Sequence, residues 1–148
     1  MNHVMIVGQA PSRTSDPKRP LTGRTGSMLA WWCGLSAEEF QARFVLRNVL
    51  SQWPGPAPGG GDVAPTGRSA RTSLLDVLEQ APPGVTHVVL LGQAVRRLMF
   101  GPASLPPYEW FLVVGGHWIA WAPHPSRVSR HWNSVAATEA ACHFFRRL

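Results

Sequence analysis

Short apolar stretches that alternate with helical patterns are the feature that most constrains the fold of this chain. The stretches at residues 3–7, 44–50, 85–91, 110–114 and 117–121 are typical of strands, and Gly115-Gly116 between the last two predicts a hairpin. Helices are expected over residues 27–32, 37–43, 73–80 and 93–100, followed by a last helix that begins after Asn133 or Ser134 and runs to Arg147. Strands that alternate with helices form a parallel sheet covered on both faces. The pattern therefore predicts an α/β protein, and 148 residues fit one domain spanning residues 1–148.

Two of the expected helices carry more detailed signals. Ser36 with Glu39 three residues later forms a capping box, which predicts that a helix begins at Ala37. The apolar positions of the last helix are expected to share one face: Val135, Ala136, Ala140, Phe144 and Leu148.

Two long segments are rich in Gly and Pro and are expected to be loops. The first runs from Gln9 to Arg24, and three prolines exclude a helix there. The second, from Trp53 to Thr72, has no hydrophobic period and spans about twenty residues. Loops of that length in compact domains are usually functional or disordered.

Three polar segments each follow a predicted strand. They are the Gly8–Gly26 loop, Asn48 with the residues after it, and the turn His124-Pro125-Ser126. Ligands of open α/β sheets bind beyond the carboxyl ends of the strands, so these segments are expected to meet in one crevice. His124 lies between two prolines that restrict its backbone, which favours a functional histidine. The histidines at positions 3, 87, 117 and 143 are interpreted as structural.

Several classes of protein are excluded or disfavoured. The chain contains neither GxGxxG nor GxxxxGK[ST], which disfavours the common nucleotide-binding loops. Cys33 and Cys142 are the only cysteines and cannot form a structural zinc site or a four-cysteine iron–sulfur cluster, so buried reduced thiols are expected. No apolar run approaches the roughly 18 residues of a membrane span, and no secretion signal is visible. We expect a soluble cytoplasmic protein, nucleoid-associated if bacterial, without metal or cofactor.

The charge balance points to a polyanionic partner. The formal net charge is +6, from 14 basic and eight acidic residues, and thirteen of the basic residues are arginine. Basic domains bind phosphate chains, which favours nucleic acid as the partner. A GC-rich genome would also produce many Arg, Gly, Pro and Ala, so the composition alone leaves both explanations open.

The order of short motifs resembles the uracil-DNA glycosylase superfamily over nearly the whole chain. The branch it resembles has a first motif GEAPG, which corresponds here to Gly8-Gln9-Ala10-Pro11-Ser12, followed by a PFVGRAG-like stretch at residues 20–26. Asn48 follows a strand, as the uracil-reading asparagine of the family does. Leu90-Leu91-Gly92-Gln93 and the HPS motif His124-Pro125-Ser126 complete the series.

The resemblance implies a three-layer α/β/α fold with a central, mainly parallel four-stranded sheet, and a monofunctional DNA glycosylase. Such an enzyme flips a nucleotide out of DNA and hydrolyses the bond between base and deoxyribose, leaving an abasic site. His124 is expected to donate to the departing base, where losing one donor typically costs about 3–4 kcal/mol. The implied base-binding residues are Asn48, Leu21, Ala10 and Gly8. The implied DNA-binding residues are Ser12, Arg24, Ser126, Arg127, Val128 and Arg130, with Arg127 and Val128 as the wedge left in the base stack.

The chain also departs from the family pattern. Ala10 stands where the best-known members have Asp or Asn, and Gln9 stands where the branch has Glu, so the catalytic set contains an amide that cannot act as a base. Asp16 is the nearest carboxylate in sequence and is the candidate for polarising water or stabilising the oxocarbenium sugar. Leu21 replaces the base-stacking Phe, which weakens stacking and leaves room for a base other than uracil. The cysteines that bind the branch's iron–sulfur cluster are absent.

Three functions remain open from the sequence. The first is excision of uracil or of a modified pyrimidine, such as a substituted cytosine of phage DNA, in repair or in defence. The second is a catalytically inactive glycosylase fold that serves as a DNA-binding or inhibitory module, and the third is a hydrolase of free nucleosides. The expected partner is DNA containing uracil or a modified pyrimidine, and we expect a monomer.

Overall fold

The structure is a computed structural model that describes residues 3–112, 115–125 and 130–148. Its strands are β1 (Val4–Gly8), β2 (Val45–Asn48), β3 (His87–Leu91), β4 (Phe111–Leu112) and β5 (Trp118–Ala122). Its helices are α1 (Arg24–Cys33), α2 (Ala37–Arg43), α3 (Gly67–Glu79), α4 (Gln93–Phe100) and α5 (Val135–Phe145), with the 3₁₀ helix η1 (Arg130–Asn133) before α5. None of the helices in this part of the chain is long and apolar enough to cross a membrane.

The strands form one sheet in the order β2-β1-β3-β5-β4. The four strands β2, β1, β3 and β5 are parallel, and only the two-residue edge strand β4 runs antiparallel, to β5. The predicted parallel sheet is therefore confirmed. The predicted antiparallel pairing across Gly115-Gly116 is confirmed as well, and it joins β4 to β5 at one edge of this sheet. Because the parallel strands end at the same edge, Gly8, Asn48, Leu91 and Ala122 mark a single rim of the sheet.

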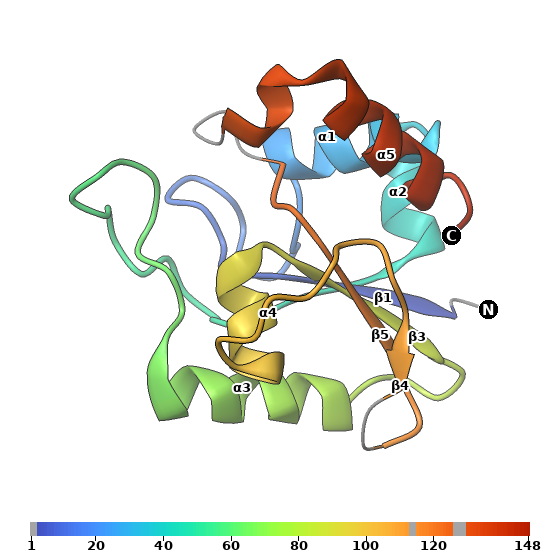
Figure 1. The fold of residues 1–148 in the computed structure, drawn as a ribbon. Coiled ribbons are helices and arrows are strands. Elements are labelled where there is room, and N and C mark those ends of the chain that lie inside the picture. The colour runs from blue at the N-terminus through green and yellow to red at the C-terminus, as the bar shows by residue number, and fades with distance from the viewer. Residues whose placement is uncertain (1–2, 113–114, 126–129) are drawn as a thin grey trace.

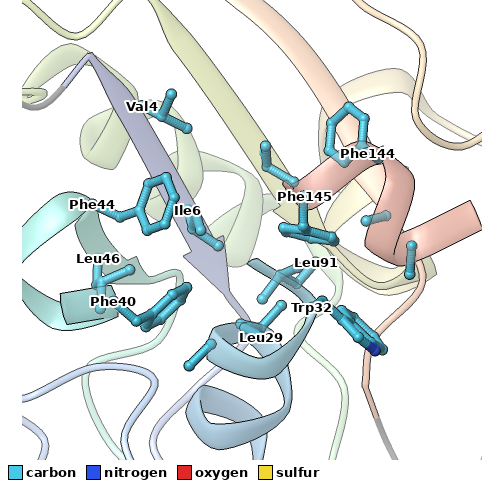
Figure 2. Close-up of a cluster of buried hydrophobic side chains, with 14 of the residues drawn as sticks. Val4, Ile6, Leu29, Trp32, Phe40, Phe44, Leu46, Leu91, Phe144 and Phe145 are labelled. Atoms are coloured by element: carbon cyan, nitrogen blue, oxygen red, sulfur yellow. The ribbon is translucent and has the colours of Figure 1, made fainter. Parts of the chain in front are cut away.

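Helices cover both faces of the sheet, as predicted (Figure 1). Helices α1, α2 and α5 lie on one face, and α3 and α4 lie on the other. Alternate residues of β1 enter the two cores: Ile6 faces the first set of helices, and Met5 faces the second. Figure 2 shows the first core, where the rings of Trp32, Phe40 and Phe145 lie against the sheet. Near-complete burial of these large side chains fixes the sheet and, with it, the rim.

The capping box at α2 is present as predicted. The Glu39 backbone N–H donates to the Ser36 hydroxyl at 3.1 Å, and the Ser36 N–H donates to the Glu39 carboxylate at 2.7 Å. Both bonds satisfy amide groups that a helix start otherwise leaves unpaired. The expected bounds of α2 and of α4 agree with the structure.

Two predicted helix starts are wrong, since both helices begin earlier than expected. Helix α1 begins at Arg24 rather than at residue 27 and includes Gly26. Helix α3 begins at Gly67 rather than at residue 73, so the long loop ends at Thr66 and not at Thr72. Only the stripe Ala70, Leu74 and Leu78 of α3 is buried, so the first turns of this helix are mostly polar. With so few apolar residues there, the helical period is hard to recognise in the sequence.

The predicted apolar face of α5 is correct for Phe144 and Leu148, which pack in the first core, and wrong for Val135, Ala136 and Ala140. Its buried residues are Ala141, Phe144 and Phe145, whereas Val135 is 75% exposed and Ala140 is exposed. The helix packs on the sheet through its C-terminal half, so the apolar residues of its first turn face outward. Ser134 caps the helix as predicted, since its hydroxyl accepts the Ala137 N–H.

Replacing Gly26 by alanine is expected to destabilise the protein strongly. A Cβ at position 26 would overlap the carbonyl oxygen of Leu21, which is main chain and cannot rotate away. Overpacking of this kind typically costs about 1–3 kcal/mol or more. Urea unfolding should show the loss, while Gly59→Ala, where a Cβ meets nothing within 4 Å, should leave the free energy of unfolding within about 0.5 kcal/mol. Equal stability of the two variants would contradict the packing of Leu21 on α1.

Candidate active site

The segments after β1, β2 and β5 meet at the rim of the sheet. Gly8 pairs with Asn48 in the parallel register of β1 and β2. The chain continues this pairing beyond the strands, since the N–H groups of Val49 and Leu50 donate to the carbonyls of Gly8 and Gln9 at 3.0 and 2.9 Å. These bonds hold Asn48 beside the loop that follows β1.

A cavity of about 450 Å³ opens at this rim. We call it the strand-end cavity. It is lined by Gln9, Ala10, Pro11, Ser12, Ser15, Pro20, Leu21, Thr22, Thr25, Asn48, Gly60, Gly61, Asp62, Val63 and His124. The structure thus brings together six of the site residues predicted from sequence: Gln9, Ala10, Ser12, Leu21, Asn48 and His124. Its volume lies in the range of cavities that hold small-molecule ligands.

The Asn48 side chain lines this cavity and contains a buried hydrogen-bond acceptor without a partner in the described part of the chain. Its Oδ1 is buried and has no hydrogen-bond partner among the described residues. Gly8 lies beneath it, and a Cβ there would come within 2.8 Å of both Asn48 Oδ1 and Leu21 Cδ2. Buried polar atoms are normally paired, so an orphaned acceptor in a cavity indicates a group that a ligand satisfies.

His124 is held by its neighbours in the turn after β5. The Trp132 indole N–H donates to the His124 carbonyl at 2.9 Å, which ties the turn to η1. Gly92 (φ +89°) lies against the ring: a Cβ there would be 3.3 Å from His124 Cβ and 3.1 Å from Gln9 Nε2. Burial lowers the pKa of the His124 imidazole, and the Asp62 carboxylate opposes the shift. His124 is therefore neutral at pH 7 and offers one N–H donor.

Asp62 is a carboxylate at the cavity that the sequence did not single out. The segment 55–63 folds back as a hairpin-like turn, with a bridge between Pro56 and Asp62 and positive φ angles at Gly60 and Gly61. The Trp53 indole N–H donates to Asp62 Oδ1 at 2.9 Å. Most of the predicted long loop is thus hydrogen-bonded structure that lies beside the loop after β1 (Figure 1).

A comparison with known protein families shows to which family the chain belongs. The family model described as the uracil DNA glycosylase superfamily matches residues 2–147. The chain belongs to the uracil DNA glycosylase superfamily. A search of curated proteins found no match. Membership of this superfamily supports the general assignment of the chain as a DNA glycosylase, with DNA as its partner.

Asp16 and Arg24, which the sequence predicted to be site residues, do not line the strand-end cavity. Asp16 is exposed and does not line it; its carboxylate accepts the N–H of Lys18 at 2.9 Å within the same turn. Arg24 is exposed at the start of α1 and lines a separate groove beside the cavity. Asp62, and not Asp16, is therefore the carboxylate that lines the strand-end cavity.

The remaining predicted contacts lie at the HPS motif. Ser126, Arg127 and Val128 are outside the described residues, so their expected DNA contacts stay predictions. Arg130 begins η1, and its expected phosphate contact stays a prediction as well.

The two cysteines lie apart from the strand-end cavity. Cys33 and Cys142 are free and half-buried, and burial raises the pKa of Cys33 to about 12. The described residues contain no cluster of three or more His, Cys, Asp or Glu side chains that could hold a metal ion.

The free energy of unfolding is expected to decrease from pH 7 to pH 5, and His124 is expected to cause part of this decrease. The folded state lowers the pKa of this imidazole, whereas the unfolded chain binds its proton near pH 6.5. Below that pH the unfolded state therefore takes up a proton that the folded state resists, and stability is lost. Urea unfolding at both pH values should show a smaller loss for His124→Gln than for the wild type. The same change at exposed His3 serves as the control; an unchanged loss in His124→Gln would contradict the buried neutral imidazole.

Proposed function

We propose that this chain is a monofunctional DNA glycosylase that flips a pyrimidine into the strand-end cavity and hydrolyses its N-glycosidic bond. The observation that carries the proposal is that Asn48, whose Oδ1 is buried without a partner among the described residues, lines the same cavity as His124, whose pKa is lowered by burial. One group reads the edge of a base, and the other can donate to it as it leaves.

The Asn48 amide suits the pairing edge of a pyrimidine. Its Oδ1 accepts an N–H, and its Nδ2 donates. Uracil offers N3–H and O4, and cytosine offers N4–H and N3, so an amide in either orientation matches one of them. Gly8 keeps the space beside Asn48 open, since a side chain there would meet Oδ1.

His124 stabilises the leaving base. When the glycosidic bond breaks, its electron pair goes to the base and negative charge builds up on O2. A neutral imidazole N–H aimed at O2 stabilises this charge. The turn Pro123-His124-Pro125 and the Trp132 bond hold the donor in place before the reaction, so little reorganisation is needed.

Water then completes the reaction at the sugar. The C1′ carbon carries positive charge after the base departs, and water adds to it, loses a proton and leaves an abasic deoxyribose. Asp62 is the carboxylate that lines the cavity and can stabilise this charge and accept the proton. Gln9 can hold the water through its amide oxygen but cannot remove its proton.

The lining of the cavity favours a pyrimidine that carries a substituent. Leu21 is non-aromatic where the family has a base-stacking Phe, Ala10 is small where the best-known members have Asp or Asn, and the volume of about 450 Å³ exceeds that of a bare pyrimidine ring. Ser12, Ser15 and Thr22 add hydroxyls to the wall. A polar group at C5, as in the substituted cytosines of phage DNA, fits this wall and favours a role in defence over general uracil repair.

The proposal is tested by incubating the protein with oligonucleotides that contain uracil or C5-substituted cytosine. An abasic-site nuclease should cut the treated strand at the modified position, and more readily with the substituted base. Tight binding without abasic sites on every substrate would instead favour an inactive DNA-binding module, which the absence of an acid at Gln9 and Ala10 motivates. Cleavage of free nucleosides without cleavage of DNA would favour a nucleoside hydrolase.

A further inference from the structure

A second hollow beside the strand-end cavity has aromatic walls. It has a volume of about 810 Å³, and we call it the Trp31 groove. It is lined by Gly23, Arg24, Thr25, Ser27, Met28, Trp31, Trp32, His124, Pro125 and Trp132. Trp32 and Trp132 pack together in its wall, with ring centroids 4.6 Å apart.

The outer wall of the groove is an exposed face of α1. Arg24, Met28 and Trp31 are spaced four and three residues apart and therefore share one side of the helix. Trp31 is 58% exposed and Met28 is 41% exposed, whereas the neighbouring Trp32 is 2% exposed. Trp31 contributes little to the core, so its large apolar surface facing solvent indicates an interaction surface.

The groove is continuous with the proposed base site. Thr25 and His124 line both hollows, so the two share a wall. A DNA strand whose target base occupies the strand-end cavity must place its neighbouring nucleotides next to that wall. Because the two hollows are continuous, the ligand of the groove is expected to be part of the same DNA strand and not a separate molecule.

The chemistry of the groove matches unpaired nucleotides. An exposed indole provides a stacking surface for a base, Arg24 provides a cation for a phosphate, and none of the described residues that line the groove is acidic. Resting on the function proposed above, we propose that the Trp31 groove binds a nucleotide flanking the target in single-stranded DNA, with its base stacked on Trp31. Paired bases cannot stack there, so the groove makes the enzyme favour single-stranded over duplex substrate.

Binding of an oligonucleotide without a target base tests the groove. A fluorescein-labelled oligothymidine is titrated with wild type, Trp31→Ala, Trp31→Phe and Trp118→Ala. Trp118 is 42% exposed at the start of β5, away from the rim, and is the matched control. Trp31→Ala should weaken binding about 10-fold, because base stacking on an aromatic ring contributes about 1–3 kcal/mol. Trp31→Phe should restore most of the affinity, and Trp118→Ala should bind as the wild type does.

Excision kinetics add a second readout. In single-turnover reactions, Trp31→Ala should raise the protein concentration needed for half-maximal rate on single strands and leave the maximal rate within about twofold. It should also reduce the preference for single strands over duplexes. Unchanged oligothymidine binding in Trp31→Ala, or equal loss in Trp118→Ala, would overturn the proposal. If no DNA yields abasic sites, the proposed enzyme fails, but the oligothymidine titration still decides whether the groove binds single strands.

Discussion

Replacing His124 by alanine is expected to slow base excision about 10²–10³-fold in single-turnover reactions, because a donor to the leaving base is lost. The imidazole lies beside Gly92 and burial lowers its pKa, and the proposed function assigns its N–H to the charge on the leaving base rather than to DNA affinity. The maximal rate should therefore fall, while affinity for a substrate-containing strand should change little.

The control for this variant is His3→Ala, which removes an exposed imidazole ahead of β1, at the opposite end of the sheet from the rim. It should excise at the wild-type rate. Circular dichroism should show that His124→Ala is folded. A folded His124→Ala with more than a tenth of the wild-type maximal rate would remove His124 from the chemistry.

Replacing Asn48 by alanine is expected to lower excision about 10–100-fold without destabilising the protein. A good bidentate pair between an amide and a base edge contributes about 1–3 kcal/mol, which is lost in the variant. In the free protein, however, Asn48 Oδ1 is buried without a partner among the described residues, and a buried unsatisfied group typically costs about 1–3 kcal/mol. The free energy of unfolding should therefore stay the same or rise.

This opposite response of activity and stability separates a functional from a structural asparagine. A structural amide at the end of β2 would lose stability and activity together. Urea unfolding and single-turnover excision on the same preparation measure both. A loss of more than about 1 kcal/mol in Asn48→Ala would contradict the assignment of Asn48 as a base reader.

Much of the fold was accessible from local sequence signals. The strands are apolar runs, α2 has a complete capping box, and α4 ends at Phe100 as expected. The meeting of Asn48 and His124 followed from topology alone, because parallel strands end at one edge.

The errors arose where long-range packing determines local structure. Gly26 is inside α1 because the Leu21 carbonyl approaches that turn, and no neighbour in sequence signals this contact. Asp62 enters the site because Gly60 and Gly61 turn the chain and Trp53 binds the carboxylate. The eight residues between Trp53 and Asp62 have no hydrophobic period that would indicate the contact, although the unusual length of the Gly/Pro-rich segment marks it as a functional candidate.

Mass spectrometry of bases released from DNA tests the central assignment most directly. Single-stranded DNAs that carry uracil or C5-substituted cytosines are incubated with wild type, Asn48→Ala and His124→Ala, and the small-molecule fraction is analysed. We expect an intact free pyrimidine from the wild type, in amounts equal to the abasic sites formed, and greatly reduced release from both variants. Release of no base from any of these DNAs by the folded wild-type protein, or equal release by all three proteins, would contradict a glycosylase site built on Asn48 and His124.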